Sequence, residues 1–274
     1  MACCCKWASD DSVKRMIAWL DSGDAFPPAT DALTDPNGLL CAGLELTADR
    51  VLDAYGQGIF PWYSEGQPVL WWSPDPRMVL RPEDFRLHRS LRKTLRNTVY
   101  EVRVDSSFEA VMRACAELRP DQDGTWISEA IIAAYTQLHK RGLAHSVETW
   151  VDGELVGGLY GIALGRVFFG ESMFMRRTDA SKIAFAHLVE QLRRWQFELV
   201  DCQQKTEHLA SLGAAPIRRA EFLQRLQRLV NSPADVSLQG RWQFDADLGA
   251  SLTRTAKTAE ANGGLANAAV LNHQ

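Results

Sequence analysis

The chain has 274 residues, of which 46% are hydrophobic and 23% charged, and its formal net charge at pH 7 is −4. This size and composition suit one main α/β domain with a small companion, and the acidic balance argues against a globally basic nucleic-acid-binding protein. No stretch is long and apolar enough to cross a membrane and the N-terminus lacks the apolar core of a signal peptide, so we expect a cytoplasmic protein without membrane contact.

The N-terminal quarter of the chain predicts an extension and a small α+β domain. Residues 1–24 form the extension, in which residues 10–20 are expected to be helical. Residues 25–75 are rich in Pro, Gly and aromatic residues and are assigned to the small domain. Within it, Thr47 is a candidate N-cap for a helix that runs to about Tyr55 and ends at the glycines that follow.

Residues 76–248 predict the main domain, in which helical and extended patterns alternate. The pair Asp152-Gly153 is typical of a hairpin turn. Residues 249–274 have little apolar content, and we expect them to form a disordered tail. The expected strands are 77–80, 100–104, 146–151, 155–164, 166–174 and 199–203, and the expected helices are 89–96, 108–118, 128–141, 181–196 and 218–229.

A strand, a helix and a second strand in this domain form a crossover unit. Such a unit normally places its two strands, here 166–174 and 199–203, parallel within one sheet. If the strands are neighbours, their C-terminal ends lie side by side, at the edge where open α/β sheets usually bind ligands. Glu171 would then lie within reach of Asp201 and Gln203.

Strand alternation predicts which of these side chains share a face. Asp201 and Gln203 are two residues apart and point to the same side, whereas Cys202 points to the other. This orientation argues against Cys202 as a nucleophile with a histidine base. The six cysteines also lack disulfide or metal-ligand spacing, so we expect reduced thiols and no bound metal.

In the first strand of the crossover, Glu171 and Met173 are expected to share a face with Phe169. One surface would then present three polar groups beside an apolar patch. The alternative is a buried carboxylate that is paired with an arginine such as Arg77 or Arg166.

A basic segment cuts across the acidic average of the chain. Residues 86–96 contain no acid, and a helix from residue 89 would place four cations on one face. A solvated helix face is one interpretation, and a phosphate-binding surface is the other. The four residues are Arg89, Arg92, Lys93 and Arg96.

Tryptophans are frequent and fall into two groups. Trp71 and Trp72 lie in an apolar run, and core packing is their expected role. Trp62 and Trp126 lie on predicted loops, where they could stack an unpaired base. No glycine-rich phosphate cradle precedes the crossover helix, because residues 179–181 read Asp-Ala-Ser where a GNAT-type acetyltransferase would hold coenzyme A. We therefore expect no cofactor.

Six runs of sequence occur in an order that is typical of one protein family: 58–62, 71–77, 124–127, 170–174, 201–203 and 210–214. Together they resemble the bacterial leucyl/phenylalanyl-tRNA–protein transferase family. The resemblance implies a GNAT-like α/β (α+β) domain with a mixed sheet behind a small N-terminal domain. It also implies transfer of Leu, or less often Phe, from aminoacyl-tRNA to proteins with N-terminal Arg or Lys, which marks them for degradation by the N-end rule. Residues 41–46 depart from the family's usual Gly-Gly-Asp-Leu-like turn.

The resemblance assigns roles to the polar residues of the crossover. The reaction is aminolysis of an ester, and an α-amino group with a pKa near 8 is mostly protonated at pH 7, so a group must accept its proton. Asp201, acting with Gln203, would orient and deprotonate the amine. Glu171 would either bind the cationic acceptor residue or assist the proton transfer.

The remaining roles concern the aminoacyl-tRNA. Trp62 and Trp126 would flank the 3′ adenosine, and the basic helix would meet the acceptor-stem phosphates. We expect a monomer, and the rival functions are a coenzyme A-dependent N-acyltransferase and a non-catalytic tRNA-binding protein. The expected walls of the aminoacyl side-chain pocket are Met173, Leu159, Leu188, Leu192 and Val200.

Overall fold

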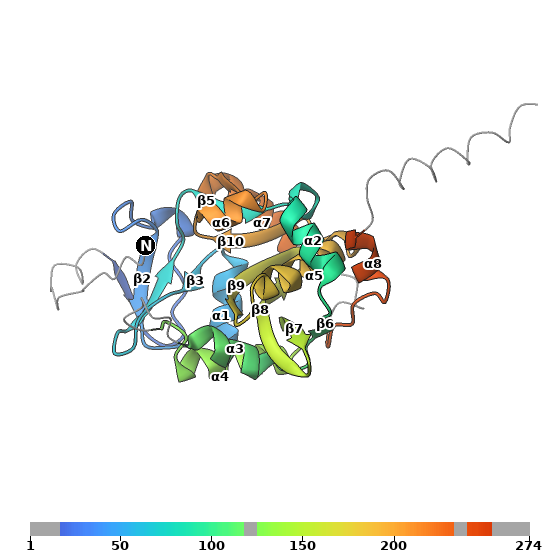
Figure 1. Ribbon diagram of the computed structural model, residues 1–274. Coiled ribbons are helices and arrows are strands. Elements are labelled where there is room, and N and C mark those ends of the chain that lie inside the picture. Colours follow the sequence, from blue (N-terminus) through green and yellow to red (C-terminus); the bar gives the residue numbers. More distant parts are fainter. Residues whose placement is uncertain (1–16, 118–124, 233–239, 254–274) are drawn as a thin grey trace, which may run out of the picture.

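The computed structural model describes residues 17–117, 125–232 and 240–253, and it contains two β-sheets that lie side by side with helix α1 between them (Figure 1). The smaller sheet has the strand order β1-β2-β4-β3. Helix α1 contacts α4 and α7 of the larger unit. The elements of the smaller unit are β1 (Ala18–Leu20), β2 (Leu39–Gly43), α1 (Ala48–Gly56), β3 (Phe60–Pro61) and β4 (Val69–Trp72).

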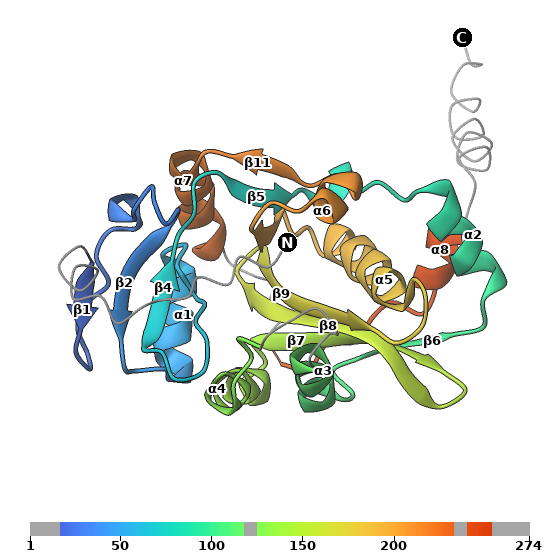
Figure 2. The same cartoon turned by 60° about the vertical axis from the view of Figure 1, so that its left-hand side comes forward.

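The larger sheet has seven strands in the order β11-β5-β10-β9-β8-β7-β6. Helices α5, α2 and α8 lie on one side of it and α3 and α4 on the other (Figure 2). Its strands are β5 (Arg77–Leu80), β6 (Glu101–Val104), β7 (Ala144–Val151), β8 (Glu154–Leu164), β9 (Val167–Met175), β10 (Leu199–Gln203) and β11 (Ala215–Ile217). Its helices are α2 (Arg89–Asn97), α3 (Phe108–Ala116), α4 (Glu129–Lys140), α5 (Ala180–Arg194), α6 (Glu207–Ser211), α7 (Arg219–Val230) and α8 (Leu248–Thr253).

The predicted crossover is confirmed. Strands β9 and β10 pair in parallel, with Leu199 opposite Val167 and Asp201 opposite Phe169. All other pairings in the seven-stranded sheet are antiparallel, so the sheet is mixed and the α/β class is confirmed. The parallel pair brings the C-terminal ends of β9 and β10 to the same edge.

Strand alternation divides the interior into two apolar clusters. Phe169 and Leu199 belong to the cluster that also contains α1, α3, α4 and α7, whereas Phe168 and Val200 belong to the cluster under α5. The first cluster continues into the small sheet, so both sheets share one core. Trp71, which is 1% exposed, lies within it, as expected for core packing.

Local capping explains where two predicted helices begin. The Thr47 side chain accepts a hydrogen bond from the backbone of Arg50 at the start of α1, and Ser128 accepts one from Ile131 at the start of α4. Each side chain satisfies one of the backbone N–H groups that a first helical turn leaves without a partner.

Both ends of the described chain differ from expectation. The helix expected over residues 10–20 falls largely outside the described residues, and its last part is strand β1, which pairs in parallel with β2. The tail expected from residue 249 begins with helix α8, whose Leu248 and Leu252 are buried. These two apolar residues, four positions apart on one side of the helix, are enough to hold α8 in place because they pack against the existing core. Within the described ranges, no helix is long and apolar enough to cross a membrane.

Candidate active site

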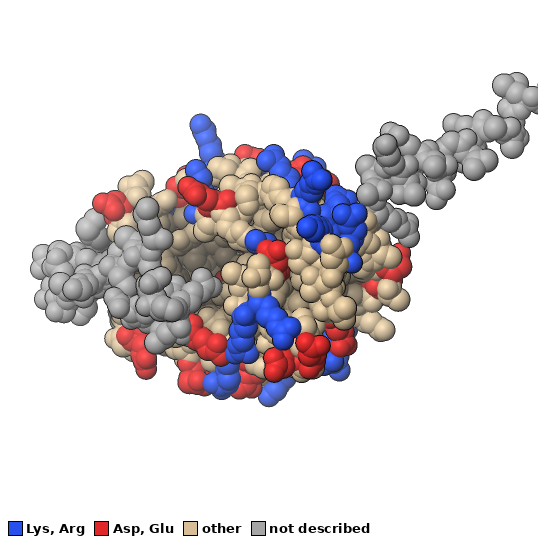
Figure 3. Space-filling model, in the orientation of Figure 1, with Lys and Arg blue, Asp and Glu red and all other residues tan. Residues whose placement is uncertain are grey.

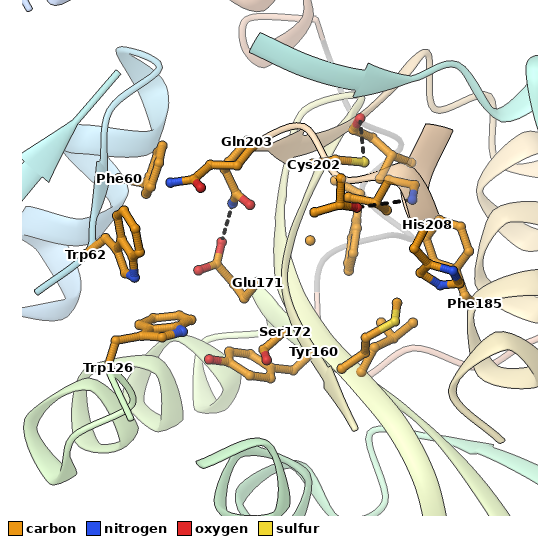
Figure 4. Close-up of a pocket in the computed structure, with 18 of the residues that line it drawn as sticks. Phe60, Trp62, Trp126, Tyr160, Glu171, Ser172, Phe185, Cys202, Gln203 and His208 are labelled. Carbon is orange, nitrogen blue, oxygen red and sulfur yellow. Dashed lines mark hydrogen bonds between the residues drawn. The ribbon is translucent and has the colours of Figure 1, made fainter. Parts of the chain in front are cut away.

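A cavity of about 460 Å³ opens where the two sheets meet. Figure 3 shows the surface hollowed in this region, and Figure 4 shows the side chains around it. The cavity lies at the C-terminal ends of the parallel strands β9 and β10, and strand β3 of the small sheet forms the opposite wall. The lining residues are Phe60, Pro61, Trp62, Trp126, Leu159, Tyr160, Phe168, Gly170, Glu171, Ser172, Met173, Phe185, Val200, Cys202, Gln203, Gln204, Thr206, His208 and Leu209.

Glu171 is the one carboxylate among the described lining residues. Three side chains donate hydrogen bonds to it: the hydroxyls of Tyr55 at 2.6 Å and Tyr135 at 3.1 Å, and the Gln203 amide at 3.0 Å. Burial raises the pKa of Glu171 to about 7, although these hydrogen bonds counteract the rise. A carboxyl group with this pKa can accept and release a proton near neutral pH.

A β-bulge sets the direction of Glu171. Tyr160 pairs with Ser172 and Gly161 with Gly170, so Glu171 is an extra residue of β9 without a partner in β8. The expectation that Met173 shares a face with Phe169 is therefore wrong, because Phe169 lies in the first apolar cluster and Met173 packs against the second. The bulge reverses the alternation after Glu171.

Asp201 is a buried carboxylate that is paired with an arginine, which is the alternative that the sequence left open. Its side chain is fully buried and accepts two hydrogen bonds from Arg77, from Nε at 2.8 Å and from Nη2 at 2.6 Å. It also accepts one from the backbone N–H of Gln203 at 3.0 Å. Asp201 is not among the lining residues. The expectation that its side chain faces the site together with Gln203 is therefore wrong.

Arg77 connects this pair to the small sheet. Its Nη1 donates to the backbone carbonyl of Gly58 at 3.1 Å, and its guanidinium lies over the rings of Phe60 and Phe222. The positions of Gln203 and of the neighbouring strand β3 thus depend on one buried ion pair. Asp201 and Gln203 do not share a face, because a bulge in β10 lies between them and Gln203 has a φ of 53°.

Cys202 lines the cavity, although alternation placed it outside the site. Burial raises the pKa of its thiol well above the ordinary value, so the thiolate needed for nucleophilic attack is not available at neutral pH. The sequence-based reason for discounting a cysteine nucleophile, that Cys202 points away from the site, is therefore wrong.

The part of the cavity beyond Cys202 is mainly apolar. Three of the expected wall residues, Met173, Leu159 and Val200, line it, together with Phe185 and Leu209, which were not expected. The other two, Leu188 and Leu192, are fully buried in the cluster under α5 and do not reach the cavity. Helix α5 thus contributes Phe185 instead, near His208 at the far end in Figure 4.

The other end of the cavity is aromatic. Trp62 and Trp126 both line it, on the side of Glu171 opposite to Cys202 and Phe185 (Figure 4). The backbone carbonyl of Trp62 accepts a hydrogen bond from the indole of Trp72 at 2.6 Å, which fixes the loop that carries Trp62. The two loop tryptophans that the sequence singled out therefore lie at one site.

Tyr55 and Tyr135 contact Glu171, and the sequence did not reveal this. They come from α1 and α4, their hydroxyls lie 2.8 Å apart, and both are fully buried. Each occupies the apolar face of its helix, where a tyrosine looks like ordinary core. Only the fold shows that both hydroxyls meet the carboxylate of Glu171.

Tyr55→Phe should raise the pKa of Glu171 further, because it removes a hydrogen bond that stabilises the ionised carboxylate. A carbon-13 NMR titration of the Glu171 carboxyl would measure the change. Tyr160→Phe is the matched control, since the Tyr160 hydroxyl is buried and has no hydrogen-bond partner among the described residues. Equal titration curves for Tyr55→Phe and Tyr160→Phe would contradict this assignment.

The basic helix forms as expected. Helix α2 buries Leu91 and Leu95. Its cations form a patch in Figure 3, over the upper right of the face shown there. Of the four predicted residues, Arg89, Lys93 and Arg96 are exposed and Arg92 is half-buried.

The expected position of a coenzyme A pyrophosphate holds a carboxylate instead. Asp179, at the N-terminus of α5, has a φ of 64° and accepts hydrogen bonds from Thr94 at 3.0 Å and Lys182 at 2.9 Å. A negative charge at this point repels a pyrophosphate. Among the described residues there is also no group of acids, histidines and cysteines that could hold a metal ion.

Comparison with known proteins gives a consistent result. Residues 79–227 match the family described as leucyl/phenylalanyl-tRNA protein transferase, and residues 45–75 match the N-terminal domain of the same family. A leucyl/phenylalanyl-tRNA–protein transferase of Nitrosospira multiformis is 60% identical over 230 residues, which are 84% of this chain and 98% of the relative. One of Chromobacterium violaceum is 58% identical over 218 residues, covering 80% of this chain and 94% of the relative.

Solved structures are more distant. A GCN5-related N-acetyltransferase from Kribbella flavida is 12% identical, with a TM-score of 0.33, and the match covers 60% of this chain and 59% of that one. The L-PGS structure from Bacillus licheniformis is 10% identical, with a TM-score of 0.34, and the match covers 78% of this chain and 71% of that one.

Proposed function

The chain belongs to the leucyl/phenylalanyl-tRNA protein transferase family and is an aminoacyltransferase, and from this premise we propose which substrates meet in the cavity. Leu, or less often Phe, moves from aminoacyl-tRNA to the α-amino group of proteins that begin with Arg or Lys. The added residue then marks those proteins for degradation. The observation that carries the proposal is the carboxylate of Glu171, the one that the described residues bring to the cavity, between its aromatic and its apolar part.

Glu171 is the group in a position to accept the proton. In the proposed reaction the α-ammonium group of the acceptor gives a proton to the Glu171 carboxylate, and the free amine attacks the ester carbonyl. A C–N bond forms, the C–O bond to the ribose breaks, and the ribose oxygen leaves with a proton. The raised pKa of Glu171 suits this transfer at neutral pH.

Asp201 and Gln203 have separate roles in this proposal. Gln203 lines the cavity and donates to Glu171, so it orients the carboxylate and can contact the substrate. Asp201 is a positioning residue that holds the backbone of Gln203 and is itself held by Arg77. The sequence-based expectation that Asp201 accepts the proton is therefore replaced by a proposal that Glu171 does.

The aminoacyl-tRNA end would occupy the remaining parts of the cavity. The 3′ adenosine stacks against Trp62 and Trp126, and the Leu or Phe side chain enters the apolar part beside Met173. Methionine adapts its shape, which suits two acyl groups of different outline. Helix α2 would meet acceptor-stem phosphates. We further propose that the protein acts as a monomer in the cytoplasm, where charged tRNA is found, and the domain boundary after residue 75 stays a prediction.

Trp62→Ala should raise the KM for charged tRNA by about 5- to 150-fold, since stacking on one aromatic side chain contributes roughly 1–3 kcal/mol per base. Steady-state kinetics at saturating acceptor peptide would measure it. Trp19→Ala is the control, because Trp19 is half-exposed on β1 and does not line the cavity. A similar KM for both variants would argue against adenosine stacking at Trp62.

A reaction with defined substrates tests the proposed function. The protein is incubated with leucyl-tRNA and, separately, with peptides that begin with Arg, Lys, Gln or Glu, and products are identified by mass spectrometry. The proposal predicts a peptide extended by one Leu only when the first residue is Arg or Lys. Extension of all peptides alike would refute the acceptor class, and extension of none would refute the proposed substrates.

A further inference from the structure

The C-terminal segment 241–253 lies beyond residue 227, where the match to the family model ends, and it is packed against helices α5 and α2. None of its residues lines the cavity. It runs along α5 and ends in helix α8, beside the basic helix α2 (Figure 2). The segment therefore does not take part in the chemistry of the cavity, and its contacts with α5 and α2 indicate another role.

The first attachment of this segment is Trp242. Its ring stacks on His145 with centroids 3.7 Å apart, and Trp195 meets it edge-on at 4.9 Å. Its backbone N–H donates to the buried Asp105 at 2.8 Å. Trp242 is 4% exposed, so the segment starts from a fixed point in the core.

The second attachment is polar and lies along α5. Arg194 donates to Asp245 at 2.8 Å and to Asp247 at 2.6 Å, so it bridges two acids of the segment. One turn before Arg194 in α5, Glu190 accepts a hydrogen bond from the Ser251 hydroxyl at 3.0 Å. These contacts orient α8 relative to α5.

The third attachment reaches the basic helix. Leu252 of α8 belongs to a small buried cluster with Leu91 and Leu95 of α2. Ile183 and Ala186 of α5 complete that cluster. The two apolar residues of α2 therefore rest on α8 as well as on α5.

Helix α2 needs such support. It has nine residues, no acid in its first turn and no side-chain cap. A helix of this length is marginal in water, and like charges three and four residues apart destabilise it further. Most of its stability must come from the tertiary contacts of Leu91 and Leu95.

We propose that segment 241–253 is a brace that holds helix α2 in the orientation in which it meets tRNA, with Leu252 as its positioning residue. The inference rests on the proposed function in one respect, that α2 contacts tRNA phosphates. The brace adjusts tRNA binding and leaves the chemistry in the cavity unchanged.

Leu252→Ala tests the brace with two donors, leucyl-tRNA and 3′-leucyl-adenosine, which lacks the acceptor stem. We expect the KM for leucyl-tRNA to rise roughly 3- to 30-fold at unchanged kcat, and transfer from 3′-leucyl-adenosine to stay unchanged. Thr253→Ala is the control, since among the described residues the Thr253 hydroxyl donates only to backbone carbonyls of α8. An unchanged KM for leucyl-tRNA, or equal losses with both donors, would overturn the proposal.

A second pair of variants keeps the test decisive. If Leu252→Ala does not fold, Arg194→Gln loosens the second attachment without leaving a cavity, and the same difference between donors is expected. Lys93→Ala distinguishes a failure of the brace from a failure of the proposed tRNA contact at α2. A raised KM for Lys93→Ala with a normal KM for Arg194→Gln and Leu252→Ala would refute the brace but keep α2 as the tRNA contact, whereas a parent protein inactive with leucyl-tRNA would refute the proposed function instead.

Discussion

Glu171→Gln should slow single-turnover transfer by about 10²- to 10⁴-fold, the usual contribution of a positioned general base. Glutamine keeps the shape of the side chain, and its Oε1 can still accept from Tyr55 and Gln203 while its amide N–H can donate to the Tyr135 hydroxyl, but it cannot accept the proton of the α-ammonium group. Rapid-quench measurement with saturating leucyl-tRNA and a peptide that begins with Arg isolates this step. An undiminished rate would show that another group, or the substrate itself, takes the proton.

The same variant makes an independent prediction about stability. The pKa of Glu171 is raised from 4.5 to about 7 in the folded protein, so its stabilising contribution is present below pH 4.5 and is lost as the pH rises through about 7. Glutamine does not ionise and escapes this loss. Glu171→Gln should therefore gain stability over the parent as the pH is raised from about 5 to about 8, and thermal unfolding at the two pH values measures the difference.

Asp201→Ala should lower the free energy of unfolding by about 3–5 kcal/mol, because it leaves the fully buried Arg77 without its partner. It should also reduce kcat, since the backbone of Gln203 loses its acceptor. Urea unfolding and transfer kinetics on the same preparation measure both effects. Retained stability together with full activity would contradict the positioning role.

Two further variants show whether the loss comes from the unpaired charge. The double variant Arg77→Met, Asp201→Ala removes both charges and should recover part of the stability that Asp201→Ala loses. Glu83→Ala removes the partner of the exposed Arg81 and should change stability far less. Equal losses in Glu83→Ala and Asp201→Ala would mean that burial of the pair is not what matters.

Much of the large sheet could be predicted because its elements have strong local signals. The Asp152-Gly153 turn and the apolar runs around it predicted the antiparallel strands β7 and β8, and the helix that follows β9 predicted a parallel partner. The small sheet was not predicted strand by strand. Its strands are only two to five residues long, and β3 contains Pro61, so they are too short to show an alternating pattern of apolar and polar residues.

The strand ends that the sequence singled out border the cavity, but alternation misplaced individual side chains, for a physical reason. Period-two alternation holds only in regular strands, and bulges at Glu171 and next to Gln203 break it at the two positions that matter. The pairing of Asp201 with Arg77 and the approach of Tyr55 to Glu171 join residues more than a hundred positions apart. Such contacts follow from the fold and leave no local pattern in the sequence.

The pH dependence of single-turnover transfer tests the central claim, that Glu171 accepts the proton, most directly. The rate is measured between about pH 5 and 9 for the parent, Tyr55→Phe and Tyr160→Phe with one acceptor peptide, so that the titration of the acceptor amine is common to all three. If Glu171 accepts the proton, the rising limb moves to higher pH in Tyr55→Phe and stays in place in Tyr160→Phe. Superimposable profiles for all three proteins would contradict it.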